Sequence, residues 1–390
     1  MPPSIQNLFT RIKRRLIKSS PPLNKQVVSL SPHASPKGNV LLSYILEPFL
    51  LDNEAAIPDS HTHYWESYQI AQTFLQLGYS VDVIHYQNFT FKPEKNYDFF
   101  VSARTNLEAV SKNLPDSCVK VAHLDTAHWS TSNYNAYGRI VDLKNRKNIS
   151  LSNLKFIDIN NAIEYADLGT ILGNDFTIDT YKYAGKPIHR IPISTTGVYP
   201  WPENKNFSDC KKSFVWFGSS GFVHKGLDLV LEAFSGMPDY KLIVCGPFEE
   251  EKSFVEAFHK ELYETPNITP FGWVDVNSEN FTRICNNSIA LIYPTCSEGG
   301  GGSAITCMHA GLIPILSYEA SVDIQDTGFI LENCSVKSIQ KTIKYVSELE
   351  DTALEAISKN AWHFARDHHT KETFAREYKN FVEKTLLNFK

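Results

Sequence analysis

The sequence predicts an α/β fold made of two doubly wound domains that face one another across a cleft, with helices at the C-terminus. Three observations support this prediction. The chain has 390 residues, which suits two domains of ordinary size better than one. Apolar strand patterns alternate with amphipathic helix patterns, and this alternation occurs twice along the chain. Residues 199–212 separate the two runs with prolines and polar side chains, which is typical of a linker between domains.

The composition is that of a globular protein. Hydrophobic residues make up 42% of the chain and charged residues 21%. The net charge of −5 gives no reason to expect nucleic acid as a partner. No apolar stretch of 18 residues and no secretory signal is present, so we expect a cytoplasmic protein. The seven cysteines are scattered without a C-x-x-C pair, which indicates reduced thiols.

Residues 1–37 precede the first domain. Residues 4–18 place apolar side chains at helical spacing among lysines and arginines, a pattern typical of a helix that lies on an anionic membrane surface. A frayed basic terminus explains the same residues equally well. Residues 19–38 are rich in Pro and Ser and predict a linker. If the basic helix forms, we expect the protein to be peripheral on the cytoplasmic membrane face.

Residues 38–198 form the first predicted domain. Its apolar runs suit strands buried in a parallel sheet, and its main helix ends at Gly78, where a C-terminal glycine belongs. The expected elements are strand 39–46, helix 64–79, strands 80–86, 97–103 and 118–125, a helix end and strand within 163–173, and strand 188–194.

Residues 213–365 form the second predicted domain and repeat this pattern. Residues 366–390 predict a further helix, which we expect to pack back on the first domain. The expected elements are strands 213–219, 240–246, 290–295 and 312–317, and helices 227–237, 254–264, 281–289 and 304–311, with residues 267–274 following helix 254–264. Because ligands of doubly wound sheets bind at the carboxyl ends of the strands, we expect the site in the cleft.

A glycine-rich loop lies between strand 290–295 and helix 304–311. It reads "SEGGGGSAITCMHAG" and places Glu298 before four glycines, Gly299–Gly302. A flexible linker would interrupt a strand–helix unit in the middle of a domain. Glycines let a backbone approach a ligand closely, and a helix N-terminus favours anions, so the loop predicts a phosphate or sugar site.

The second domain resembles the group 1 glycosyltransferases, a family with the GT-B fold of two Rossmann-like domains. In that family a strand leads into a P-[ST]-x-x-E-G-x-G loop, and an upstream block reads K-G-x-D-x-L-x-x-A-F. In the first domain, "IEYADLGTILG" resembles the family's E-x-A-D-x-I-x-x-x-S. The matching second-domain residues are Lys225, Gly226, Asp228, Ala233, Phe234, Pro294, Thr295, Glu298, Gly299, Gly301, Met308, Gly311 and Pro314.

The resemblance implies that a sugar moves from a nucleotide-sugar donor, linked to UDP or GDP, to an acceptor with retention of configuration. It implies that Lys225 neutralises the leaving diphosphate and that Glu298 accepts hydrogen bonds from the donor sugar. No D-x-D motif occurs, so we expect no metal and no other cofactor. The donor-binding residues that it implies are Gly218, Ser219, Ser220, Lys225, Gly246, Trp273, Val274, Glu298, Gly299, Gly300, Gly301, Gly302, Ser303 and Thr306.

Two positions depart from the family pattern. The family has a second glutamate eight residues after the first, which holds the ribose hydroxyls, and Thr306 stands there instead. A neutral hydrogen bond is weaker than a charged one, so this change weakens donor binding by about tenfold. The family often has an arginine after its first strand, where this chain has Ser219 and Ser220. Hydroxyls do not neutralise a diphosphate, so its binding depends more on Lys225.

The first domain supplies the remaining candidates. The segment "HLDTAHW" ends a strand with His123, Asp125 and His128. The resemblance implies a histidine beside the donor sugar, and His123 and then Asp125 are our catalytic candidates there. The H-x-D-x-x-H spacing also suits a metal, and His128 suits a structural role equally well.

The loop after the first strand supplies acceptor-side candidates. It carries His61, His63 and Glu66, and helix capping explains the polar residues around them equally well. The insertion 47–58 lengthens this loop, which we expect to shape the acceptor site.

The function predicted is a metal-independent, retaining glycosyltransferase that acts on a surface glycan or a glycolipid. Two alternatives stay open. One is another GT-B enzyme, such as a sugar phosphorylase or a nucleotide-sugar epimerase. The other is a catalytically degenerate GT-B subunit that binds a glycan or a partner protein.

Overall fold

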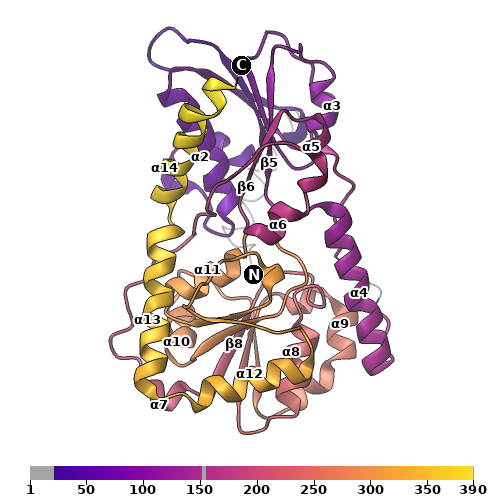
Figure 1. Cartoon of the computed structure of the whole chain (residues 1–390), viewed down its shortest axis with the longest axis vertical. Helices are drawn as coiled ribbons and strands as arrows, with labels where there is room; N and C mark the ends of the chain where they lie inside the picture. The colour runs from indigo at the N-terminus through magenta and orange to yellow at the C-terminus, as the bar shows by residue number, and fades with distance from the viewer. Residues whose placement is uncertain (1–21, 152–154, 390) are drawn as a thin grey trace, which may run out of the picture.

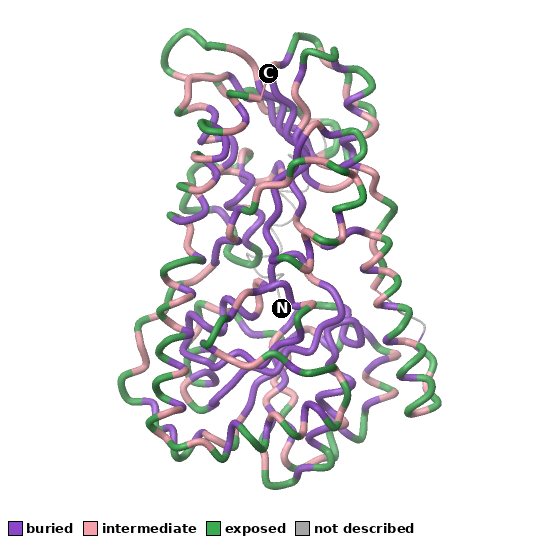
Figure 2. The backbone as a smooth tube through the Cα atoms, in the orientation of Figure 1, coloured by how far each residue is buried: buried purple, intermediate pink, exposed green. Residues whose placement is uncertain are grey.

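The computed structural model describes residues 22–151 and 155–389. The basic segment 4–18 lies outside these residues. Figure 1 shows two α/β domains, one above the other, with long helices running along both sides. In Figure 2 the buried residues concentrate in the strands at the centre of each domain. The predicted fold class, two doubly wound domains with C-terminal helices, is confirmed.

The first domain contains a seven-stranded sheet with the order β1-β3-β2-β4-β5-β6-β7. Strands β2 to β7 pair in parallel, and the crossover from one side of β2 to the other places the switch point between β2 and β4. The strands are β1 (Val27–Leu30), β2 (Asn39–Tyr44), β3 (Ser80–His85), β4 (Phe99–Ala103), β5 (Val119–Leu124), β6 (Leu168–Ile171) and β7 (Ile188–Arg190).

Strand β1 lies inside residues 19–38, where the sequence predicts a linker. It pairs antiparallel with β3 at the edge of the sheet, and Val28 contacts the hydrophobic core. Proline and serine dominate the segment as a whole, but the short run "VVSL" has the β-branched residues that an edge strand needs.

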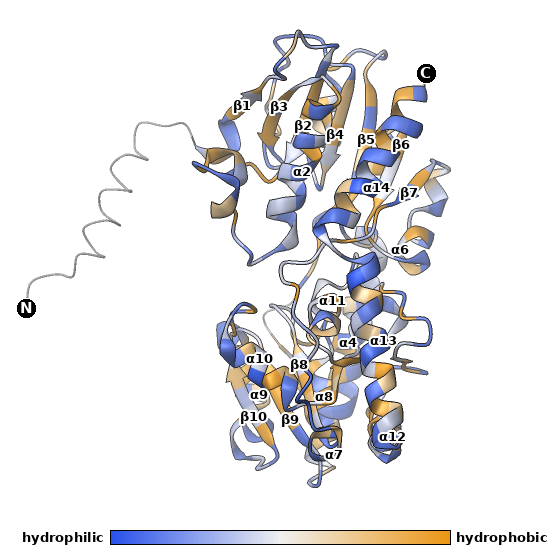
Figure 3. Cartoon of the chain, turned by 90° about the vertical axis from the view of Figure 1, so that its left-hand side faces the viewer, coloured by the Kyte–Doolittle hydropathy of each residue, from blue (hydrophilic) through white to orange (hydrophobic). Residues whose placement is uncertain are grey.

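Short helices surround this sheet. Helix α2 (Thr62–Gln76) buries Ile70, Ala71 and Phe74 against it, and Figure 3 shows the apolar strands facing this helix. The insertion 47–58 folds largely as two 3₁₀ turns, Glu47–Leu50 and Glu54–Ala56. The remaining helices are α3 (Leu107–Ser111), α5 (Ala162–Tyr165) and α6 (Asp175–Asp179).

The second domain contains a parallel sheet with the order β10-β9-β8-β11-β12-β13 and a switch point between β8 and β11. Its strands are β8 (Ser213–Phe217), β9 (Lys241–Cys245), β10 (Ile268–Gly272), β11 (Ala290–Tyr293), β12 (Ile313–Leu316) and β13 (Phe329–Ile330). Its helices are α7 (Phe207–Cys210), α8 (Leu227–Ser235), α9 (Lys252–Ala257), α10 (Glu279–Asn286), α11 (Gly302–His309) and α12 (Val336–Glu348).

Helix α4 (Trp129–Lys147) follows β5 of the first domain but packs on the second domain (Figure 1). Leu143 belongs to the second domain's hydrophobic core. Arg139 donates to the backbone carbonyl of Pro294, and Asn135 donates to that of Cys296. The ion pair between Arg146 and the fully buried Asp228 spans 2.6 Å. The sequence analysis missed this helix, because its buried face is short of apolar residues.

Two C-terminal helices connect the domains on the opposite side. Helix α13 (Asp351–His368) packs on α11 of the second domain, and α14 (Lys371–Lys384) packs on α2 of the first. The ring of Phe374 contacts that of Trp65 at 5.9 Å between centroids. None of the helices in the described residues is long and apolar enough to cross a membrane.

Candidate functional site

A cavity of about 610 Å³ opens between the domains, at the carboxyl ends of the strands in both sheets. The switch points of both sheets lie at this cavity: the loops after β8 and β11 form one wall, and residues 58–63 after β2 form another. Among the predicted residues, Glu66, His123, His128 and Ser220 do not line it. Those that line it are His61, His63, Asp125, Gly218, Ser219, Lys225, Gly246, Trp273, Val274, Glu298, Gly299, Gly300, Gly301, Gly302, Ser303 and Thr306.

The glycine run 299–302 packs closely against the first domain at Gly299 and Gly300. A Cβ atom on Gly299 would lie 2.1 Å from the backbone oxygen of Asp125. Gly301 has φ of +55°, and a Cβ atom there would lie 2.6 Å from the oxygen of Ala320. Gly299 therefore permits contact between the domains, and Gly301 permits a close turn within the second domain, while the run as a whole leaves backbone open to a ligand.

Helix α11 begins directly after these glycines. Gly301 is its N-cap and no side chain caps it, so the first N–H groups of this helix are available at the cavity. Such an end carries partial positive charge and favours an anion.

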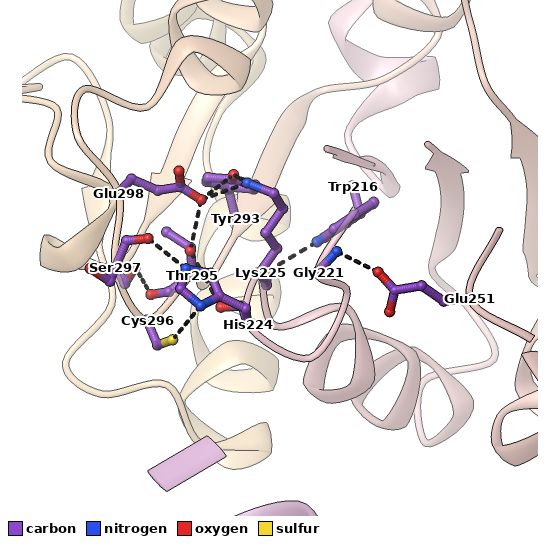
Figure 4. A network of polar contacts seen from close by, with 11 residues as sticks. Trp216, Gly221, His224, Lys225, Glu251, Tyr293, Thr295, Cys296, Ser297 and Glu298 are labelled. Atoms are coloured by element: carbon purple, nitrogen blue, oxygen red, sulfur yellow. Dashed lines mark hydrogen bonds and ion pairs between the residues drawn. The ribbon is translucent and has the colours of Figure 1, made fainter. Parts of the chain in front are cut away.

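Lys225 and Glu298 form a buried ion pair in the cavity wall (Figure 4). The Nζ atom of Lys225 lies 2.6 Å from Oε1 of Glu298, and the hydroxyls of Tyr293 and Thr295 donate to the same oxygen at 2.8 and 3.1 Å. Burial alone would lower the pKa of Lys225, but the Glu298 carboxylate outweighs it and raises that pKa. Burial would raise the pKa of Glu298, yet the charge of Lys225 holds it well below its usual range. Both groups therefore stay charged at neutral pH.

His224 connects the lysine loop to the glutamate loop. Its Nε2 atom lies 2.7 Å from the carbonyl oxygen of Ser297, and its own carbonyl accepts from the N–H of Cys296. Burial lowers the pKa of His224 to about 4, so the ring is neutral. His224 therefore holds the two loops together, and it does not line the cavity.

The two departures from the family pattern take different forms in the structure. The Thr306 hydroxyl donates to the carbonyl of Gly302 at 2.9 Å, so its hydrogen is already used. Ser219 is exposed and lines the cavity, whereas Ser220 is exposed outside it.

The first-domain wall holds a linked polar group. Arg104 donates to Asp125 at 3.0 Å, and its Nη2 atom lies 3.0 Å from Nδ1 of His63. His61 is the N-cap of α2 and its ring lies 4.1 Å from that of His63. Asp125 and the two histidines therefore present donors and acceptors to the cavity. Arg104 was not predicted, because a lone arginine after a strand has no sequence signal.

Three of the four predicted residues that do not line the cavity belong to the first domain. His123 is 1% exposed, bonds Thr170 through Nδ1 and packs against Tyr378 of α14, so direct contact with a donor sugar does not fit this placement. Glu66 accepts hydrogen bonds from the N–H and hydroxyl of Ser194. Burial raises the pKa of Glu66 to about 7.

The third residue is His128. It caps α4 and bonds the hydroxyls of Ser130 and Tyr183, which gives it a structural role. Within the described residues, no group of three or more His, Cys, Asp or Glu side chains is arranged to hold a metal ion.

Lys155 also lines the cavity, and sequence reasoning missed it. It belongs to the irregular segment after α4, about 70 residues before Lys225 in the chain. The neighbouring charge of Lys225, together with burial, lowers the pKa of Lys155 to about 8.

The comparisons with known proteins agree with this geometry. The family model described as "Glycosyl transferases group 1" matches residues 203–363. No curated protein sequence matches the chain.

Solved structures share its fold at low identity. Sucrose-phosphate synthase of Thermosynechococcus elongatus is 12% identical with a TM-score of 0.61, covering 90% of this chain and 100% of that one. HepE of Anabaena, solved with UDP and glucose, is 13% identical with a TM-score of 0.56, covering 90% and 100%. WaaG, a glycosyltransferase involved in lipopolysaccharide biosynthesis, is 14% identical with a TM-score of 0.52, covering 89% and 99%.

Proposed function

We propose that this chain, in which residues 203–363 match the model of the group 1 glycosyltransferases and the fold is that of solved glycosyltransferases, transfers a sugar from a nucleotide-sugar donor to an acceptor hydroxyl, with retention of configuration and without a metal ion. The observation that carries the proposal is the buried Lys225–Glu298 pair beside the N-terminus of α11. The pair and the helix end put positive charge and a hydrogen-bond acceptor at one wall of the cavity.

The chemistry that we propose uses this charge on the leaving group. The bond between the sugar's anomeric carbon and the diphosphate breaks, and its electron pair goes to the diphosphate oxygen. Lys225 and the amides of α11 stabilise that developing charge, which lowers the barrier. The acceptor oxygen forms its bond on the face that the diphosphate leaves, and its proton goes to the departing diphosphate. Because lysine and backbone amides carry the electrostatic role, this scheme requires no divalent cation.

The donor's other parts have matching surfaces. Trp273 is 66% exposed and lines the cavity together with Val274, so it offers an aromatic face to the nucleobase. Glu298 keeps its second carboxylate oxygen for a sugar hydroxyl. HepE shares the fold and was solved with UDP and with UDP-glucose, which supports a uridine nucleotide as the first donor to test.

The acceptor enters from the first-domain side in this proposal. His61, His63 and Asp125 line that side and can bind sugar hydroxyls. A glycan or glycolipid acceptor is supported by the likeness to WaaG and by the basic segment 4–18. Flotation with anionic liposomes, with and without residues 1–20, tests the membrane part; equal recovery of the two forms would contradict it.

A second candidate is a GT-B subunit that binds a glycan without catalysis. One observation favours it, namely that Thr306 replaces the ribose-binding acid and spends its hydroxyl on Gly302. This subunit would bind nucleotide weakly or not at all and would release no nucleotide diphosphate.

The experiment is a panel of UDP- and GDP-sugars with the purified full chain, measured by release of nucleotide diphosphate. We expect release with at least one donor, and its loss in Lys225→Met. The control is Lys341→Met, since Lys341 is 80% exposed and far from the cavity residues. If neither UDP nor GDP binds and no donor is turned over, the transferase proposal is overturned.

A further inference from the structure

The cationic end of the cavity holds more positive charge than its own carboxylate balances. Glu298 is ion-paired with Lys225, which accounts for one lysine. Lys155 lines the same cavity and is close enough for the Lys225 charge to be the largest influence on its pKa. The described residues give Lys155 no carboxylate within ion-pair distance. Glu251 shares a smaller neighbouring pocket with Lys155, but it accepts a hydrogen bond from the backbone of Gly221. Glu298 is the carboxylate that acts on both lysines at this end of the cavity, so Lys155 keeps charge that is available to an anion.

Lys155 is positioned by contacts on both sides of it along the chain. Before it, α4 is anchored to the second domain by Arg139 and by the Arg146–Asp228 ion pair. After it, the Asn133 side chain of α4 holds both the N–H and the carbonyl of Ile157, at 2.8 and 2.9 Å. Ile157 is therefore held to α4 two residues after Lys155, and Lys155 itself lines the cavity.

Gly221 makes room for the Lys155 side chain. Its φ is +88°, and a Cβ atom there would lie 2.5 Å from Cδ of Lys155. The N–H of Gly221 donates to Glu251 at 2.5 Å, so that carboxylate is held by the backbone of the same loop. The aliphatic part of Lys155 thus packs on the loop that follows β8, which is where the two serines replace the family's arginine.

We propose that Lys155 is a binding residue for the donor diphosphate and supplies the positive charge that Ser219 and Ser220 do not. This inference rests on the proposed function, since it concerns the same donor. The second cation of the site, Lys155, then comes from the first half of the chain, shortly after α4. Donor binding is then coupled to the docking of α4 on the second domain.

The test measures binding of UDP, GDP, inorganic pyrophosphate and uridine to the wild type, Lys155→Met and Lys155→Arg. A charge-assisted hydrogen bond accounts for a change of roughly 10- to 100-fold in affinity. We expect Lys155→Met to lose about that much affinity for the diphosphates and little for uridine, while Lys155→Arg retains diphosphate binding. Lys341→Met is the control for a lysine outside the cavity.

Two further measurements separate a binding role from a structural one. Removal of Lys155 relieves its repulsion with Lys225, so we expect the Tm of Lys155→Met to stay the same or rise. The wild type's diphosphate affinity should fall above about pH 8, as Lys155 loses its proton, and Lys155→Arg should shift that loss to higher pH.

The outcomes are distinguishable. Loss of diphosphate binding in Lys225→Met with unchanged binding in Lys155→Met overturns this inference and leaves the proposed function intact. If the wild type binds neither nucleotide nor pyrophosphate, both are overturned. A lower Tm in Lys155→Met together with equal losses for uridine and UDP would show a structural lysine and would also overturn the inference.

Discussion

Replacement of Lys225 by methionine is the most informative single change in the cavity, because it leaves the Glu298 carboxylate buried without its cation. Breaking a buried ion pair from one side costs about 3–5 kcal/mol. Glu298 keeps two hydroxyl donors, Tyr293 and Thr295, so we expect the lower end, about 3 kcal/mol. For a unit of 150–250 residues this corresponds to a Tm lowered by roughly 6–12 °C.

The assay is thermal unfolding of Lys225→Met, Glu298→Gln and the double variant, with donor turnover measured on each. Glutamine accepts the same hydroxyl hydrogen bonds without a charge, so the double variant should regain about 2 kcal/mol of the lost stability. Turnover should be absent in the two variants that lack Lys225, because the cation proposed to stabilise the leaving diphosphate is missing from both. Strictly additive losses of stability in the double variant would refute the coupling between the two side chains.

Three further predictions concern pH, the glycine run and the missing acid. Burial lowers to about 4 the pKa values of four histidines, His123, His224, His309 and His369. The unfolded chain therefore takes up protons at these residues first, and the Tm should fall as the pH drops from 6.5 to 4, by up to about 1.4 kcal/mol of stability per histidine and pH unit. A flat Tm between pH 7 and pH 5 would count against this prediction. Gly299→Ala should abolish turnover and lower the Tm, because the new Cβ atom overlaps the backbone of Asp125. The control is Gly138→Ala at an exposed position of α4, which should be neutral or stabilising. Equal Tm values for the two variants would contradict this prediction. Thr306→Glu should tighten UDP or GDP binding by about tenfold in calorimetry if the ribose lies at this position, and unchanged or weaker binding would place the ribose elsewhere.

Most sheet strands were predictable because they are continuous apolar runs between turn signals, and such runs occur in parallel sheets, whereas the two-residue strand β13 has no such run. The loop from Glu298 to Gly302 was also predictable as a cavity wall, since its place between a strand and a helix fixes which edge of the sheet it reaches. Strand β1 was not, because four residues in a Pro- and Ser-rich segment carry little pattern. His123 lies at the end of β5 as predicted, but the sequence could not show that its ring is buried against Tyr44 and Tyr378.

Helix α4 shows why Lys155 could not be identified from the sequence as a residue that lines the cavity. Hydrophobic periodicity detects helices that bury an apolar face, whereas α4 is held largely by polar contacts to backbone carbonyls and to Asp228. In the sequence, Asp228 belongs to a motif of the second domain, but its ion-pair partner Arg146 comes from the first half of the chain. A division of the chain at residues 199–212 assigns the whole donor site to residues 213–365. The structure places Lys155 in the same cavity as Lys225, so the two lysines that line this cavity come from different halves of the chain.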